Sequence, residues 1–152
     1  LKSSSMFTTV DEDFSAYGLV SHRHTPEMEQ EIGGQVLFTP HLAPMNRGIL
    51  ATCYARPISA NTTTESLLQV LAEAYKNEKF VVVSEEIPST KSTQGTNAVH
   101  ITARYDARTG YAIVISALDN LTKGASGGAV QSANVALGLN ESLGLSAVGV
   151  WP

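Results

Sequence analysis

Residues 22–27, which read His-Arg-His-Thr-Pro-Glu, carry the densest group of chemically useful side chains in the sequence. A weak alternation of apolar and polar residues predicts a short strand over residues 17–24. In a strand, side chains two positions apart share a face, so His22 and His24 would point to the same side. A histidine changes charge near neutral pH, so the pair could serve in acid–base chemistry. A pair of surface histidines fits the same spacing.

Zinc binding is another interpretation of this segment, because two imidazoles and the carboxylate of Glu27 are ligand types that zinc accepts. The remaining histidines, His41 and His100, lie far along the chain. No third ligand stands at a spacing typical of zinc sites. The sequence therefore favours acid–base chemistry, and we assign no metal ligands.

The other candidate residues stand in three separate places. Cys53 alternates with apolar residues in 48–55, which is typical of a small buried strand residue and not of a nucleophile. Arg47 lies in the loop before that strand, where its guanidinium could bind a carboxylate or phosphate, or simply be solvated. Lys123 and Gly124 begin a predicted helix, and helix starts attract anions.

Hydrophobic periodicity and turn residues predict the elements that position these side chains. We expect helices at 25–33, 66–76 and 123–139, and strands at 17–24, 35–39, 49–56, 80–84, 99–104, 111–118 and 146–152. Thr62 and Glu65 predict a capping box before the second helix. The glycines and other small residues of the third helix suggest that a neighbour approaches its backbone closely.

The order of these elements predicts an α+β domain over residues 17–152, after an irregular lead-in at 1–16. The turn at 106–110 joins two β-rich segments and predicts an antiparallel hairpin. We expect a mixed, mostly antiparallel sheet with helices on one face.

Composition limits the possible partners. With 152 residues, 43% of them hydrophobic, the chain is long enough for one core without metals or disulfides. Its single cysteine indicates a reducing compartment. A formal net charge of −4 argues against nucleic acid, and no apolar segment has membrane-spanning length. We expect a cytoplasmic protein, or an organellar one in a eukaryote, with no nucleic-acid or membrane partner.

Long segments of the chain resemble the C-terminal domain of N-acetyl-γ-glutamyl-phosphate reductases. The matching residues are 22–27 with 29–30, 38–40, 44–50, 95–97 and 119–134. The resemblance implies a fold like the C-terminal domain of glyceraldehyde-3-phosphate dehydrogenase. It also implies a step of arginine biosynthesis, the NADPH-dependent reduction of N-acetyl-glutamyl 5-phosphate to the semialdehyde with release of phosphate.

The same resemblance implies roles for individual residues. His22 would activate a cysteine thiol and later shuttle a proton, while His24 and Arg47 would hold the substrate. The helix that begins at Lys123 would lie near NADP, with Lys123, Gly124 and Asn134 as the cofactor-binding residues.

The chain departs from the family pattern in one large respect. No Gly-rich dinucleotide fingerprint follows a strand, and the segment that carries the family's nucleophilic cysteine is not found. NADP would therefore be bound mainly by a domain that this sequence lacks. We expect part of a homo-oligomeric NADP-dependent acyl-phosphate reductase that is inactive by itself. A non-catalytic oligomerisation or interaction module with the same fold is the alternative.

Overall fold

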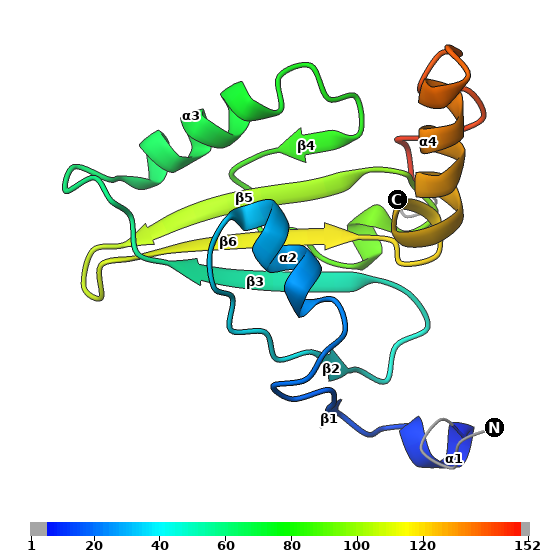
Figure 1. Ribbon diagram of the computed structural model, residues 1–152, viewed down its shortest axis with the longest axis horizontal. Coiled ribbons are helices and arrows are strands. Elements are labelled where there is room, and N and C mark those ends of the chain that lie inside the picture. The colour runs from blue at the N-terminus through cyan, green and yellow to red at the C-terminus, as the bar shows by residue number, and fades with distance from the viewer. Residues whose placement is uncertain (1–5, 150–152) are drawn as a thin grey trace. The chain divides into compact units, whose positions relative to one another are not determined.

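The structure, a computed structural model, describes residues 6–149 and divides into two compact units, Leu1–Asn46 and Arg47–Pro152 (Figure 1). The first unit contains the helices α1 (Phe7–Val10) and α2 (Thr25–Ile32). Two short strands, β1 (Ser15–Ala16) and β2 (His41–Leu42), pair antiparallel within it. A one-turn helix and a strand thus lie inside the lead-in that we expected to be irregular.

The predicted strands at 17–24 and 35–39 are wrong. Residues 17–24 form turns, because Gly18 and Val20 adopt left-handed backbone angles, with φ of +56° and +54°. These angles are incompatible with an extended strand. The pairing that does form is the shorter one between β1 and β2, at positions next to the predicted strands.

The second unit is built on a four-stranded sheet in the order β3–β6–β5–β4. Its strands are β3 (Ile49–Ala55), β4 (Val81–Val83), β5 (Val99–Asp106) and β6 (Tyr111–Leu118). β3, β6 and β5 pair antiparallel, and β4 pairs parallel to β5. The predicted hairpin and the predicted α+β fold with a mostly antiparallel mixed sheet are confirmed.

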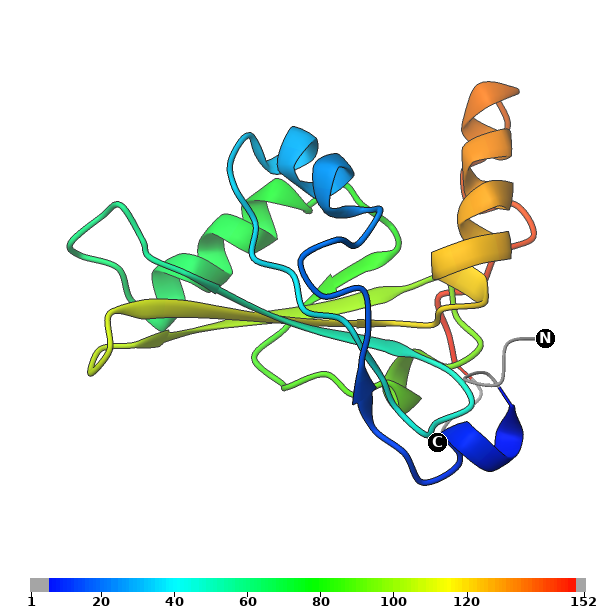
Figure 2. The same ribbon diagram turned by 60° about the horizontal axis from the view of Figure 1, so that its bottom comes forward.

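Helix α3 (Thr64–Ala74) packs against β5 and β4 on one side of this sheet. The segment between β4 and β5, which includes the short 3₁₀ helix η2 (Lys91–Thr93), runs along the opposite side (Figure 2). The capping box of α3 is formed by Thr63 and Ser66, not by Thr62 and Glu65 as predicted. The hydroxyl of Thr62 instead donates to the carbonyl of Ser59, 2.8 Å away.

The buried interior of residues 6–149 is unusually polar. Its buried hydrophobic residues are one phenylalanine and four alanines: Phe80, Ala98, Ala103, Ala112 and Ala117. The largest fully buried side chains are Asn97, Thr93, Thr96, Thr102 and Asp119. Polar side chains and small apolar ones therefore share the middle of the second unit.

The last helical region begins with a π-helical turn, η3 (Thr122–Ser126), and continues as α4 (Gly127–Ala136). The sequence predicted one continuous helix from 123 to 139. A β-carbon on Gly127 would lie 2.3 Å from Asn97 Oδ1 and 2.9 Å from the carbonyl oxygen of Thr122. One on Gly128 would lie 2.7 Å from the carbonyl oxygen of Lys123.

The paired glycines therefore permit the wide π turn and the close approach of Asn97. The sequence predicted that a neighbour would approach this helix closely. At Gly127 that neighbour is the side chain of Asn97, which belongs to the same unit. The predicted terminal strand is wrong over residues 146–149, which form no strand, and its last three residues lie outside the described part.

Candidate functional site

His22 lies in the turn that leads into α2, surrounded by aromatic rings. Its ring centroid lies 5.5 Å from that of Tyr17, 5.1 Å from that of His24 and 5.0 Å from that of Phe38, each in an edge-on arrangement. Its Nδ1 accepts a hydrogen bond from the backbone amide of His24 at 3.2 Å. The two histidines thus converge as predicted, but a turn brings them together and not a strand.

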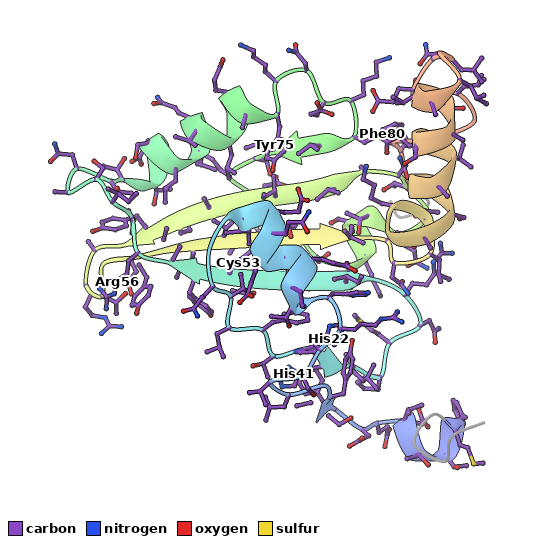
Figure 3. The ribbon with its side chains drawn as sticks, in the orientation of Figure 1. His22, His41, Cys53, Arg56, Tyr75 and Phe80 are labelled. Atoms are coloured by element: carbon purple, nitrogen blue, oxygen red, sulfur yellow. The ribbon has the colours of Figure 1, made fainter. Side chains whose placement is uncertain are left out.

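His41 belongs to the same unit but makes different contacts (Figure 3). Its ring stacks on that of Phe14, with centroids 5.1 Å apart. Its Nδ1 lies 3.1 Å from the carbonyl oxygen of Thr39. Because a carbonyl only accepts hydrogen bonds, Nδ1 of His41 must be the donor.

Arg47 forms an ion pair with the fully buried carboxylate of Asp119. Its Nη2 lies 2.7 Å from Oδ2, and its Nε donates to Oδ1 at 3.3 Å. The arginine side chain is 32% exposed. Two of the nitrogens that we expected to hold a substrate therefore bind Asp119, and within residues 6–149 no hydrogen bond of Nη1 is found.

Asp119 also anchors three backbone segments. Its oxygens accept hydrogen bonds from the amides of Gly95 (2.6 Å), Leu121 (2.8 Å) and Thr122 (3.1 Å). Burial of the carboxyl raises its pKa, but these amides and the Arg47 side chain outweigh that effect and lower the pKa of Asp119 to about 2. The charged carboxylate is thus a structural centre of the second unit.

Lys123 lines an open hollow of about 500 Å³ beside α4. Its Nζ donates to Gln131 Oε1 at 2.7 Å and lies 5.8 Å from the ring centroid of Phe80. Gln131 also accepts from Asn97 Nδ2 at 2.8 Å and donates to Glu141 at 2.6 Å. Within residues 6–149 no carboxylate lies within ion-pair distance of Lys123.

Both the Lys123 ammonium and the Glu141 carboxylate line this hollow, and the Gln131 amide is already bonded to its neighbours at both ends. Lys123 is the residue of this hollow whose charge could pair with a phosphate group. The other predicted cofactor residues are more constrained. Asn134 is buried, and its amide nitrogen donates to the carbonyls of Glu141 and Leu143. A β-carbon on Gly124 would lie 3.3 Å from Leu118 Cδ1.

Cys53 lies on β3 and is exposed, although the sequence predicted a buried residue (Figure 3). The whole of β3 is at the edge of its sheet and only Ala51 is partly buried, so alternation did not translate into burial.

Among residues 6–149, no cluster of three or more histidine, cysteine, aspartate or glutamate side chains could hold a metal ion. No helix in that range is long and apolar enough to cross a bilayer.

Sequence reasoning missed the roles of Asp119, Asn97 and Gln131. Asp119 had a usable signal, since an aspartate just after a strand often accepts from amides two and three residues later. The side chains of Asn97 and Gln131 meet across 34 positions of the chain, so no local pattern could have revealed their contact.

Residues 1–120 match the protein family described as "Semialdehyde dehydrogenase, dimerisation domain". The chain is similar to proteins named N-acetyl-gamma-glutamyl-phosphate reductase. It is 43% identical to one from Thermoanaerobacter sp., 48% identical to one from Geobacter sulfurreducens and 51% identical to one from Streptomyces avermitilis. These matches cover 98%, 99% and 91% of this chain, and 45%, 46% and 43% of the relatives.

The chain thus spans about half the length of the curated relatives that it matches. The crystal structure of aspartate semialdehyde dehydrogenase II complexed with ASA from Vibrio cholerae shares its fold, with a TM-score of 0.60 and 17% identity. That match covers 74% of this chain and 34% of the other. The mixed sheet, its covering helix and the match over residues 1–120 lead to one conclusion: this chain belongs to the semialdehyde dehydrogenase dimerisation-domain family.

Proposed function

We propose that this chain is the substrate-side and oligomerisation domain of an N-acetyl-γ-glutamyl-phosphate reductase. The observation that carries the proposal is 43–51% identity to proteins of that name over more than nine-tenths of the chain. The reaction is the reduction of N-acetyl-glutamyl 5-phosphate to the semialdehyde with release of phosphate, which serves arginine biosynthesis. When bound, NADPH supplies the hydride for this reduction.

In this proposal the chain contributes a histidine and a substrate-holding surface, while the thiol nucleophile and most of the NADP site belong to the rest of the enzyme. His22 is the catalytic residue, because it is partly exposed in a fixed ring orientation and its Nε2 makes no hydrogen bond within residues 6–149. His24 and the Nη1 group of Arg47 hold the substrate. Lys123, with the hollow next to it, contacts NADP, and Gly124 and Asn134 shape the backbone there.

We further propose that the enzyme is a homo-oligomer. The family is named for dimerisation, and the sheet of the second unit exposes large apolar side chains. Leu50 and Tyr54 on β3 are 52% and 67% exposed, and side chains four apart on a strand share a face. Light scattering should give a mass of at least twice that of one chain. The double variant Leu50→Lys, Tyr54→Lys should give a lower mass. A monomer at all concentrations would contradict this proposal.

A cytoplasmic location, or an organelle in a eukaryote, also belongs to the proposal. A single free cysteine that is exposed fits a reducing compartment. Fractionation that found the protein outside such a compartment would contradict it.

The proposed activity is best tested by placing this chain in the corresponding half of the Geobacter sulfurreducens relative, which is 48% identical to it. The chimera should oxidise NADPH in the presence of the acyl phosphate, and the isolated chain should not. His22→Ala in the chimera should lower kcat by about 10²–10³-fold, as the loss of one group acting on the reacting atoms does.

The assembly state of the chimera and its binding of NADPH serve as controls for folding. A chimera that assembles and binds NADPH yet turns nothing over would contradict the proposal. That outcome would support the alternative, a non-catalytic oligomerisation module.

A further inference from the structure

The chain turns back on itself after α2. This helix ends at Ile32, and its eight residues span about 12 Å at 1.5 Å per residue. The segment that follows, residues 33–40, runs back beside the helix towards β2 (Figure 1). The ring of Phe38 in this segment lies 5.0 Å from that of His22, which stands just before the other end of α2. We call residues 33–40 the return segment.

The return segment begins with two glycines that no neighbouring atom encloses. A β-carbon on Gly33 or Gly34 would have no atom within 4 Å, and Gly33 has a left-handed backbone, with φ of +72°. The main-chain carbonyl of Glu29 accepts hydrogen bonds from the amides of both glycines, at 2.9 and 3.3 Å, which ends the helix. Packing around the glycines therefore does not fix the direction in which the chain continues.

The side chain of Glu29 holds the return segment a few residues later. Its Oε1 accepts a hydrogen bond from the backbone amide of Val36 at 3.1 Å, in a partly buried position. Within residues 6–149 no other hydrogen bond ties residues 35–39 to α2. In the same range no cation lies within ion-pair distance of Glu29, so a salt bridge does not compete for this carboxylate. A hydrogen bond to a carboxylate is roughly twice as strong as one between neutral groups.

Chain geometry links this hydrogen bond to the place of Phe38. From Glu29 back to the first residue of α2 the helix rises about 6 Å, and an extended chain advances about 7 Å from Val36 to Phe38. The bond at Val36 therefore brings Phe38 level with the start of α2, where His22 lies. Val36 and Phe38 are partly buried, whereas Leu37 between them is 92% exposed. The two side chains thus share one side of the return segment.

We infer that Glu29 is a positioning residue of the proposed active site: its carboxylate anchors the return segment through the Val36 amide and so keeps the Phe38 ring against that of His22. The inference rests on the proposed function, which places His22 in that site. No step of the reaction is assigned to Glu29, which acts through Phe38. Loss of the anchor should loosen the ring contact without removing any group that touches the substrate.

Hydrogen exchange of the unaltered full chain, followed by NMR, tests the anchor without any substitution. The Val36 amide should exchange at least about tenfold more slowly than that of Leu37 after correction for their intrinsic rates, because a hydrogen bond to a charged group is worth that much. Leu37 is the internal reference, since no hydrogen bond of its amide is found within residues 6–149. Equal exchange at the two amides would overturn the inference.

Substitution at Glu29 tests whether the anchor places Phe38. We expect Glu29→Ala to lose the nuclear Overhauser contacts between the rings of Phe38 and His22, and Glu29→Gln, which keeps a carbonyl acceptor, to retain them. Glu31→Ala is the matched control, since Glu31 is exposed on the same helix. Contacts between Tyr17 and His22 should remain in every variant and show that the unit is folded. Phe38 contacts that persist in Glu29→Ala would overturn the inference.

In the chimeric enzyme, Glu29→Ala should lower kcat by about tenfold and leave the KM for NADPH unchanged. This loss is smaller than the roughly 10²-fold that a 1 Å misplacement of a reacting group can cost. Glu29→Gln should recover most of the activity. An unchanged kcat in Glu29→Ala would overturn the positioning role. An inactive parent chimera would refute the proposed function, while hydrogen exchange and ring contacts would still decide whether Glu29 anchors the return segment.

Discussion

His22 and Asp119 illustrate two ways in which this chain holds a polar side chain. Asp119 is fully buried, and each of its oxygens accepts hydrogen bonds from backbone amides or from Arg47. His22 is partly exposed, is fixed by one amide and by ring edges, and keeps Nε2 free of partners within residues 6–149. Asp119 has no bonding capacity to spare for a ligand, whereas His22 has one nitrogen in reserve. Of the two side chains, His22 is therefore better suited to chemistry, because it has fewer hydrogen-bond partners.

The largest effect should come from Asp119→Ala. It leaves three amides and the Arg47 guanidinium without their acceptor, so we expect a loss of about 3–5 kcal/mol in the free energy of unfolding. Urea denaturation followed by circular dichroism measures this loss. Glu73→Ala, which removes an exposed surface pair with Lys76, is the control and should leave the midpoint nearly unchanged. Similar midpoints for the two variants would show that Asp119 is not a structural centre of the second unit.

Next in size is Gly127→Ala, which tests the packing around the π turn. The added carbon meets Asn97 Oδ1 at 2.3 Å and backbone of Thr122 at 2.9 Å, so we expect about 3 kcal/mol of destabilisation, at the upper end for overpacking. Gly138→Ala is the control: its backbone is left-handed, but no atom lies within 4 Å of the added carbon. It should cost about 1–2 kcal/mol, as a left-handed alanine does. A smaller loss for Gly127→Ala than for Gly138→Ala would show that the turn can relax.

A smaller effect is expected from pH acting on Asp119. Its pKa in the folded chain is about 2, below the ordinary aspartate value of about 3.9, so the unfolded chain takes up this proton more readily as the pH falls. The resulting stability, about 2 kcal/mol, is fully present above about pH 4 and is lost as the pH falls towards 2. Denaturation midpoints measured between pH 5 and 2 should drop less steeply in Asp119→Ala than in the parent chain. Parallel curves would show that another carboxyl is responsible.

The smallest effect on stability should come from His22→Ala. The ring is partly exposed and makes one hydrogen bond, so we expect a change within about 0.5 kcal/mol, although the same change should nearly abolish turnover in the chimera. The unfolding experiment used for Asp119→Ala measures it. A loss as large as that of Asp119→Ala would mean that His22 is a structural residue.

The sequence correctly predicted the elements that form from interactions between neighbouring residues. The hairpin of β5 and β6 follows from alternation around a five-residue turn, and α3 from helical spacing. The capping box was misplaced by one residue, since Thr62 and Thr63 are adjacent and only the observed bonds distinguish them. The strand predicted at 17–24 failed because its pattern contained no sign of the left-handed angle at Val20.

The candidate site was predicted in part. His22 and His24 were identified by residue type and spacing, and they do lie side by side. Arg47 was identified as a group able to bind an anion, and the anion that it binds in the structure is Asp119. Nothing in the sequence near Arg47 indicates a partner 72 positions away.

The sequence by itself determined the α+β class, the hairpin, the main helix and which side chains have useful chemistry, because these depend on residue type and on spacing of a few positions. Only the tertiary structure decided how those side chains are used. It committed Arg47 to Asp119, brought Asn97 against Gly127, and placed the backbone amide of His24 against Nδ1 of His22. Burial and hydrogen-bond partners depend on segments that are far apart in the sequence but meet in space. The order of residues along the chain does not show which segments meet.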